Sequence, residues 1–410
     1  MILLISSSTS QDKWYQQSSP SDTRLNSVYF LNTYTGWIVD YNGMIMKTVD
    51  GGTIWKTQTT MQYNNLASVF FINDSIGWVS GGYWSNNISG VLYKTTDGGL
   101  NWFSQINYYE SFLIANLYFI NEQTGWAVNC TNDEGWGVMK TNDGGNNWST
   151  LYIGHFISCL YMLNELTGWA SGCNPGATEG AVLKTTNGGI NWTDLFVPIS
   201  EQFNAIYFAN QNSGWAVGID GIIAKTIDGG STWFEQKSTH HSLNAVQFVN
   251  ENTGWIVGFN GILKTTNGGS DWGYQNITDK ILWSVYFINQ NTGWATGNPG
   301  LIYKTTDSGG PEEIIPVNYG LNQNYPNPFN PKTTITFSLP LDSDAKLEIF
   351  DISGKKVTTL ISGILQGGIH NAIFDGTNLS SGVYFYKLTA VDIMKHSGTF
   401  IETKKMILVK

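Results

Sequence analysis

A Gly-Trp dipeptide recurs along the first three quarters of the chain and constrains the fold more than any other feature. Its tryptophans are spaced 39 to 48 residues apart: Trp37, Trp78, Trp126, Trp169, Trp215, Trp255 and Trp294. Self-similarity of this period is typical of folds in which one supersecondary unit is copied and each copy packs on its neighbours. We therefore expect seven copies of one unit, packed side by side.

Each copy has the pattern of four strands. An apolar segment such as 25–32 leads through a Thr-Gly pair into a second apolar strand that carries the dipeptide. Tight-turn residues such as Asn42-Gly43 separate the second strand from a third. The third strand ends in a Gly-Gly phrase, and a fourth begins at a second tryptophan. Four strands in seven copies, with 46 Gly and 13% charged residues, predict an all-β, seven-bladed β-propeller over residues 11–310.

The last copy of the phrase, "KTTDSGGPEE" at 304–313, lacks its tryptophan and runs into Pro311. The segment "WYQQ" at 14–17 matches the openings of fourth strands at 55–58, 102–105 and 233–236. We predict that Trp14 is the missing tryptophan. The N-terminal strand would then be the outer strand of the seventh blade and would close the ring by pairing an open edge.

The phrase, in its fullest form "TIDGGSTW" at 226–233, resembles the Asp-box of the bacterial neuraminidase repeat families. With the "TGWAVG" hairpin, the repeat resembles more closely the photosystem II assembly factor type of propeller. An acceptor side chain between Thr and Gly suits hydrogen bonds from the turn backbone. Because Asn replaces Asp twice, we expect a structural role and no catalysis at Asp50, Asp97, Asp143, Asn187, Asp228, Asn267 and Asp307.

The resemblance implies the fold and leaves the activity open. Sialidases hold the substrate carboxylate with three arginines, whereas Arg24 is the only arginine here, and it cannot form the arginine patch of photosystem assembly factors either. Other propeller glycosidases need two carboxylates across a cleft. Five lie on expected connections and no pair stands out: Glu110, Asp133, Glu134, Glu179 and Asp194. We predict no catalytic residue, metal ligand or cofactor, and a polysaccharide hydrolase stays the alternative.

Aromatic residues outside the repeat pattern indicate a binding surface. Connections after second and fourth strands share one face of a propeller, and the extra aromatic residues fall on or beside them. The candidate ligand-binding residues are Tyr83, Trp84, Tyr108, Tyr109, Asp133, Trp136 and Trp283. Aromatic rings beside Asn and Asp suit a glycan or a protein loop. Two alternatives stay open: these rings pack only their own loops, or the protein is a passive structural component of the surface.

The chain changes character after residue 310. All 17 tryptophans precede residue 311, and six of the ten prolines lie within 311–340. We expect a linker at 311–320 and a second domain at 321–410. Alternating segments at 333–339, 345–351, 371–376, 382–390 and 404–410 predict a small Ig-like β-sandwich.

The segments "NYPNPFNPKTTITFSLP" (324–340) and "GTNLSSGVYFYKL" (376–388) resemble the C-terminal sorting domain of the type IX secretion system. The resemblance implies export through Sec and then type IX secretion in a Bacteroidota-like bacterium, to the cell surface or the medium. It also implies two partners, the outer-membrane translocon and a sortase-like peptidase. Residues 1–10 read as a signal peptide remnant cut before Gln11, with a cytosolic protein as the alternative.

Charge and cysteine content exclude other classes. A net charge of −10 with one arginine argues against nucleic acid as a partner. The sequence contains no run of 18 apolar residues, so we predict no transmembrane helix. We expect a monomer. The cysteines are Cys130, Cys159 and Cys173, and Cys159 and Cys173 fall on consecutive expected strands. A disulfide between them and two buried free thiols are both compatible with this placement.

Overall fold

The computed structural model describes residues 14–61, 64–83, 89–106, 112–131, 136–152, 154–174, 179–238, 241–259, 261–275, 277–309, 313–315, 319–340, 342–393 and 399–410. The chain divides into two compact units. The first comprises Met1–Ser270 and Gln275–Pro311, and the second Asp271–Tyr274 and Glu312–Lys410. The expected signal remnant at 1–10 lies outside the described residues.

The described residues within 14–309 form consecutive antiparallel sheets, each in simple up-and-down order. Sheet one contains β2 (Leu25–Phe30), β3 (Gly36–Asp40), β4 (Met44–Thr48) and β5 (Lys56–Thr60), and sheet two β6 (Asn65–Phe71), β7 (Gly77–Tyr83), β8 (Ser89–Thr95) and β9 (Phe103–Ser104). Sheet three contains β10 (Phe112–Phe119), β11 (Gly125–Thr131), β12 (Trp136–Thr141) and β13 (Ser149–Tyr152), and sheet four β14 (Phe156–Met162), β15 (Gly168–Cys173), β16 (Gly180–Thr185) and β17 (Thr193–Leu195).

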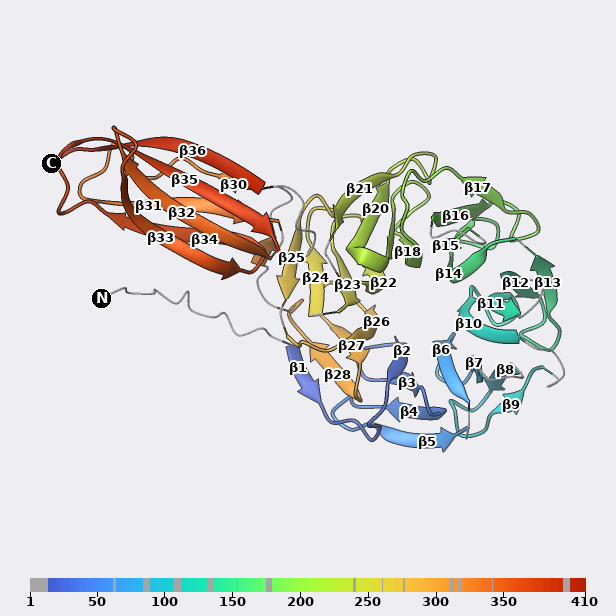
Figure 1. The fold of residues 1–410 in the computed structure, drawn as a ribbon. Helices are drawn as coiled ribbons and strands as arrows, with labels where there is room; N and C mark the ends of the chain where they lie inside the picture. The colour runs from blue at the N-terminus through green and yellow to red at the C-terminus, as the bar shows by residue number, and fades with distance from the viewer. Residues whose placement is uncertain are drawn as a thin grey trace. The chain divides into compact units, whose positions relative to one another are not determined.

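Three further sheets follow the same plan. Sheet five contains β18 (Phe203–Phe208), β19 (Gly214–Gly218), the 3-10 turn η1 (Ile219–Gly221), β20 (Ile222–Thr226) and β21 (Phe234–Ser238), and sheet six β22 (Leu243–Phe248), β23 (Gly254–Gly258), β24 (Gly261–Thr265) and β25 (Trp272–Gln275). Sheet seven contains β26 (Leu282–Phe287), β27 (Gly293–Gly297), β28 (Leu301–Thr305) and the N-terminal β1 (Trp14–Gln17). Figure 1 shows these sheets following one another around a common centre. The expected all-β class with a repeated four-stranded sheet is confirmed.

Packing explains why the Gly-Trp dipeptide recurs. A Cβ atom on Gly36 would lie 2.5 Å from the ring of Phe30 in the same sheet, so only glycine fits there. The next residue, Trp37, is fully buried and stacks on Phe71 of the following sheet with ring centroids 3.5 Å apart. The same stacking joins Trp78 to Phe119, Trp169 to Phe208, Trp215 to Phe248 and Trp255 to Phe287. The dipeptide therefore packs each sheet against the next.

The first and last sheets contact each other in the same way. Trp294 of sheet seven stacks on Phe30 of sheet one at 3.4 Å, and its indole N–H donates to the Gly51 carbonyl at 3.3 Å. β1 pairs antiparallel with β28, with Trp14 opposite Thr305. Trp14 meets Phe287 edge to face at 5.7 Å, the distance that also separates Trp55 from Phe30.

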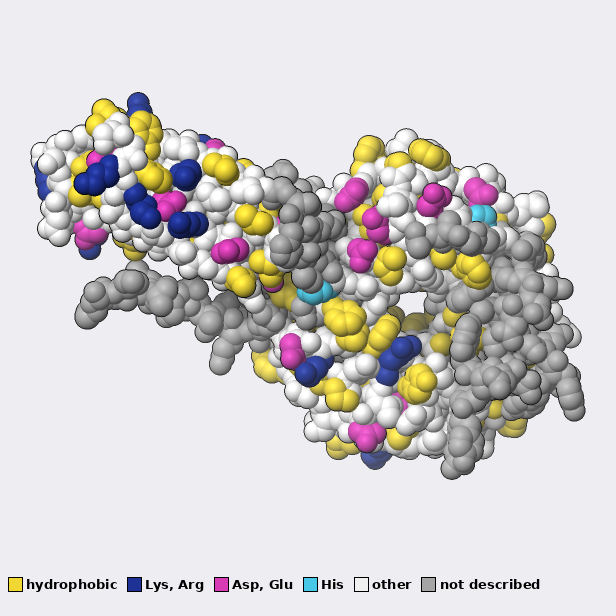
Figure 2. Space-filling view, viewed as in Figure 1, with side chains coloured by type: hydrophobic (Ala, Val, Ile, Leu, Met, Phe, Trp, Pro, Cys, Tyr) yellow, Lys and Arg dark blue, Asp and Glu magenta, His cyan; other side chains and the backbone are white. Residues whose placement is uncertain are grey.

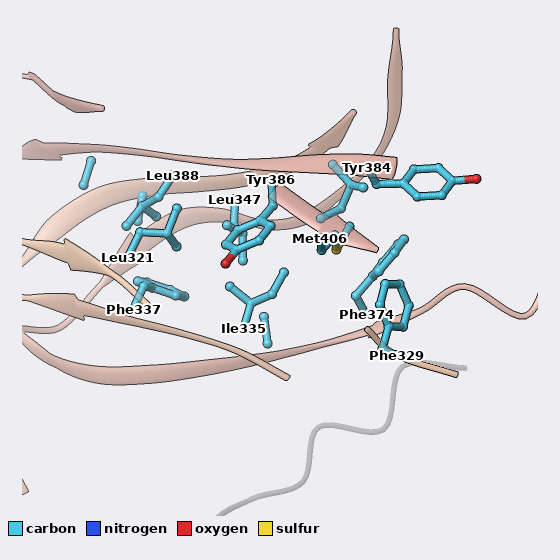
Figure 3. Close-up of a cluster of buried hydrophobic side chains, with 14 of the residues drawn as sticks. Leu321, Phe329, Ile335, Phe337, Leu347, Phe374, Tyr384, Tyr386, Leu388 and Met406 are labelled. Carbon is cyan, nitrogen blue, oxygen red and sulfur yellow. The ribbon is translucent and has the colours of Figure 1, made fainter. Parts of the chain in front are cut away.

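The second unit contains two sheets that share one buried cluster of side chains, shown in Figure 3. One sheet has the order β30 (Gly320–Leu321), β31 (Lys332–Leu339), β34 (Gly368–Asp375), and the other β33 (Lys356–Leu365), β32 (Ser343–Asp351), β35 (Gly382–Asp392), β36 (Thr399–Leu408). β29 (Glu313–Ile315) lies in the range expected to be a linker. Sequence reasoning missed β33 because irregular register opposite Leu347 and Ile349 breaks its alternation of apolar and polar residues.

The proline-rich motif of the second unit holds its C-terminal strand. The side-chain oxygen of Asn327 accepts a hydrogen bond from the Ile407 N–H at 2.9 Å. Phe329 is 1% exposed and forms a parallel bridge with Leu408. The Tyr386 hydroxyl donates to the Asn322 carbonyl at 2.7 Å. The first two contacts tie Asn327 and Phe329 to β36, and the third ties Asn322 to β35.

Candidate ligand-binding face

The connections after the second and fourth strands of each sheet define one face of the first unit, called here the loop face. Of the predicted ligand-binding residues, Trp84, Tyr108, Tyr109 and Asp133 lie outside the described residues. Tyr83 is the last residue of β7 and Trp136 the first of β12, so their backbone positions are at the loop-face ends of these strands. The structure does not describe the side chains of Tyr83 and Trp136.

Trp283 is described fully, and it is half-buried at the start of β26. Its indole N–H donates to the side-chain oxygen of Asn298 at 3.1 Å. The guanidinium carbon of Arg24 lies 3.9 Å from the centroid of its ring. The ring predicted from the sequence to bind a ligand thus lies against Arg24, the only arginine of the chain.

Sequence reasoning did not identify Arg24 as a site residue. Its Nε donates to the side-chain oxygen of Asn26, and the ring of Tyr41 lies 5.9 Å away on the same cation. Tyr41 is 52% exposed. Burial lowers the pKa of Arg24, since its charge is partly removed from water. The sequence signal for this cluster was that Trp283 and Arg24 both stand at the start of a first strand.

A pocket of about 690 Å³ opens on the loop face beside sheet four. Its lining comes from three places: His155 before β14, Asn174 and Glu179 between β15 and β16, and residues 194–200 from the end of β17 and the connection after it. A second pocket of about 410 Å³ shares Asp194 with it. Two of the five loop carboxylates singled out in the sequence, Glu179 and Asp194, thus line one cavity.

The polar groups of the pocket are held by each other. The Nε2 atom of His155 lies 3.3 Å from a carboxylate oxygen of Asp194. The side-chain amide of Asn174 donates to Glu179 at 3.5 Å. Phe196 lines the same pocket and is 81% exposed. The cavity therefore offers acceptors, an amide and an apolar ring face within one concave surface, a combination suited to hydroxylated ligands with apolar faces.

The phrase turns lie on the opposite face from the loop face. In the turn at Asp228, the Thr226 hydroxyl donates to the carboxylate at 2.8 Å, and the Thr232 backbone N–H donates to the same oxygen at 2.8 Å. Asn187 and Asn267 accept from the preceding threonine hydroxyls in the same manner. Hydrogen bonds to the ionised form hold the pKa of three of these carboxyls at about 2: Asp97, Asp143 and Asp228.

A lysine that precedes each phrase threonine connects neighbouring sheets. Lys94 Nζ donates to the Gly144 carbonyl of the following sheet at 2.8 Å, and the Trp78 indole N–H donates to the same oxygen at 3.1 Å. The lysine also lies 5.2 Å from the Trp78 ring centroid. The arrangement repeats at Gly188, Gly229 and Gly268. Sequence reasoning missed this role, although the Lys-Thr pair recurs in every phrase.

Cys159 and Cys173 are free thiols. In the register of β14 with β15, Cys159 lies opposite Ser171 and Cys173 opposite Phe156, so the two cysteines do not face each other. Burial raises the pKa of both thiols. The side chain of Cys130 lies outside what the structure describes. Among the described residues, no group of three or more His, Cys, Asp and Glu side chains is placed to hold a metal ion.

Charge is distributed unevenly along the chain. Residues 1–311 contain 22 of the 31 acidic and 12 of the 21 basic residues. Figure 2 shows the acidic side chains prevailing on the visible surface of the first unit and lysines gathered on the second. A cation on the first unit therefore stands out from its surroundings.

Two protein families match the chain. The family described as photosynthesis system II assembly factor YCF48 matches residues 6–151, 184–281 and 236–327. The chain belongs to this YCF48-type repeat family. The family described as secretion system C-terminal sorting domain matches residues 323–407. The chain thus carries a type IX sorting domain, which marks it for export to the cell surface or the medium by the type IX machinery.

Solved structures agree with the YCF48-type fold. YCF48 bound to D1 peptide has a TM-score of 0.58 at 19% identity, over 72% of this chain and 96% of that one. YCF48 from Cyanidioschyzon merolae has a TM-score of 0.56 at 19% identity, over 72% and 98%. The WD40 propeller of Doa1 has a TM-score of 0.57 at 10% identity, over 72% and 96%. At these identities the likeness shows a propeller fold. No curated protein matches the chain, and no helix among the described residues is long and apolar enough to cross a membrane.

Proposed function

We propose that this exported YCF48-type protein is a recognition module that binds a saccharide through the loop face. The observation that carries the proposal is the pocket of about 690 Å³ beside sheet four, where Phe196, Asn174 and two carboxylates converge. An exposed ring can stack on the apolar face of a sugar, and acceptors beside it can bind the hydroxyls. An exported protein meets such ligands at the cell surface or in the medium.

The test is binding of neutral oligosaccharides, arrayed by type, to the purified full chain. We expect Phe196→Ala to weaken binding about 10-fold, because a central aromatic contact contributes about 1.4 kcal/mol to the binding free energy. Phe103→Ala is the matched control, since Phe103 is 60% exposed on β9 of sheet two and does not line the pocket. Equal affinities of wild type and Phe196→Ala would contradict the pocket assignment. Absence of any saccharide ligand would favour a passive structural role, and capture of a surface protein by the same face would favour a protein ligand.

One observation supports an enzymatic alternative, because Glu179 and Asp194 line the same pocket. Paired carboxylates across a cleft are the machinery of glycoside hydrolysis. A hydrolase would release reducing ends from a polysaccharide and would lose this turnover in Glu179→Gln or Asp194→Asn. A binding protein would release none in any variant.

We further infer a ring of seven blades over residues 11–310 that is closed by the N-terminal strand. An Ig-like sandwich at 321–410 follows it and directs export. We expect the protein to be a monomer. The pairing of β1 with β28 and the stacking of Trp294 on Phe30 support the closure. The hydrogen bonds at the seven phrase positions support a structural Asp-box role. The sorting domain supports a bacterium with type IX secretion as the source, Sec export through an N-terminal signal, and handling by the translocon and a sortase-like peptidase.

A further inference from the structure

Among the described residues, no carboxylate pairs with the guanidinium of Arg24. Its Nε donates to the side-chain oxygen of Asn26. The described residues contain no hydrogen-bond acceptor for its two terminal nitrogens and no ion-pair partner. The charge is half-buried, and burial lowers its pKa. A partly desolvated cation of this kind is stabilised by any anion that can reach it, more strongly than a fully hydrated one.

The position of the guanidinium is determined by three sheets. Trp283 of sheet seven supports its plane from 3.9 Å, and Asn26 of sheet one accepts from its Nε. The amide of Asn26 donates in turn to Asn65 at 2.7 Å and to the Leu66 carbonyl at 2.6 Å in sheet two. This chain of contacts fixes the fork before a ligand arrives, which lowers the entropy lost on binding.

The groups around the fork match a sugar better than a simple ion. Tyr41 is 52% exposed on one side of the cation. The Asn298 side chain, whose oxygen orients the Trp283 indole, has an amide NH₂ without a partner among the described residues. A planar fork for a carboxylate, an aromatic face and an amide donor together recognise a carboxylated ring with hydroxyls.

From these contacts we propose that Arg24, Trp283, Tyr41 and Asn298 form a receptor for one uronic acid residue of an acidic saccharide. The inference rests on the proposed saccharide-binding function of the loop face and adds the ligand class. The excess of acidic residues in 1–311 repels a general polyanion, so selectivity comes from the two hydrogen bonds between fork and carboxylate and not from net charge.

The experiment measures binding of trigalacturonic acid and its methyl ester to the full chain by titration calorimetry in 0.15 M salt. The ester keeps the shape of the ligand and removes its charge. We expect the acid to bind and the ester to bind about 10- to 100-fold more weakly. Arg24→Gln should reduce affinity for the acid by a similar factor, and Arg24→Lys by less, because a lysine keeps the charge but loses the fork.

Lys56→Gln is the matched control, since it removes one exposed cation from β5 of sheet one without touching the receptor. It should change the affinity less than 2-fold or so. Equal binding of acid and ester, or no binding of the acid, would overturn the receptor even if neutral sugars still bind the loop face. Preference for a peptide with a free C-terminal carboxylate over the acid would overturn the saccharide class. Loss of neutral saccharide binding alone would count against the proposed function and leave the receptor supported.

Discussion

At the scale of single residues, the phrase turns show why either Asp or Asn can occupy the acceptor position. The side chain acts as an acceptor for the residue four positions later, as Asp97 does for the Asn101 N–H at 2.9 Å and Asn187 for the Asn191 N–H at 2.9 Å. Either oxygen type serves, so no charge is needed for the turn to form. The carboxylates differ from the amides in that they titrate and in their second oxygen, which accepts a further hydrogen bond, as Asp97 does from the Asn101 side-chain amide at 2.7 Å.

This difference predicts an acid-dependent stability. Asp97, Asp143 and Asp228 have a pKa of about 2 in the folded chain against 3.8 for the free side chain, so they bind protons less readily when folded. Their contribution to stability is present above about pH 4 and is lost as the pH falls toward 2. We expect the melting temperature, followed by tryptophan fluorescence, to fall over this range.

The triple variant Asp97→Asn, Asp143→Asn, Asp228→Asn should melt below the wild-type temperature at pH 7, because asparagine lacks the second acceptor oxygen, and should show a shallower decline below pH 4. Because 16 of the 17 tryptophans, all except Trp272, belong to the first unit, the signal reports mainly on that unit. An unchanged slope in the triple variant would mean that other groups govern the acid response.

At the scale of elements, β1 does the work of a fourth strand from the far end of the chain. The Trp14 indole N–H donates to Gln275 of sheet six at 2.9 Å, and the Gln275 amide donates to the Gly309 carbonyl at 2.8 Å. Gln17 repeats this role toward sheet one, where its amide donates to the Gly51 carbonyl at 3.2 Å. The Trp-x-x-Gln pattern therefore joins an outer strand to the phrase turn of its neighbour.

We predict that Trp14→Ala destabilises the first unit by about 3–5 kcal/mol, the usual cost of truncating a large buried ring. Trp14 is 7% exposed, whereas Tyr15 beside it on the same strand is 58% exposed. Tyr15→Ala should therefore cost about 0.5 kcal/mol or less. Urea unfolding followed by circular dichroism measures both, and equal midpoints for the two variants would refute the closure by β1.

At the scale of the whole molecule, the two units have separate tasks. The first carries the loop face, and the second carries the sorting signal, whose motif 322–329 holds the C-terminal strand through Asn327 and Phe329. A receptor that reads the folded sorting domain needs that strand in place. Ligand recognition and export can thus be separated by mutation.

We predict that removing residues 323–410 stops secretion in a host with type IX secretion. Phe329→Ala should lower secretion several-fold, because loss of this buried ring destabilises the sorting domain by about 3–5 kcal/mol. Tyr325→Ala is the control in the same motif, since Tyr325 is 82% exposed. Immunoblots of medium, surface and periplasm measure the outcome. Normal secretion of Phe329→Ala would show that export does not depend on the contacts between residues 322–329 and the C-terminal strand.

The sequence alone was sufficient for whatever is repeated or local. The turn glycines and the alternating strands depend on neighbours a few residues away, and the Gly-Trp spacing recurs because every copy packs on the next in the same way. The all-β class, the repeating sheet and the sorting domain could therefore be predicted. Strand β33 escaped because a bulged register removes the alternation that marks a strand. The lysine bridges escaped because their acceptors belong to the next repeat, about 50 residues on, as from Lys94 to Gly144.

The tertiary structure decided where single residues meet. Arg24 and Trp283 are 259 residues apart and touch because sheet seven packs on sheet one, and Glu179 and Asp194 share a cavity because consecutive connections emerge on one face. Periodicity indicates where each strand lies in its own sheet. It contains no information on which side chains of the first and the last sheet contact each other. The packing of sheet seven on sheet one supplies that information, and with it the contact between Arg24 and Trp283.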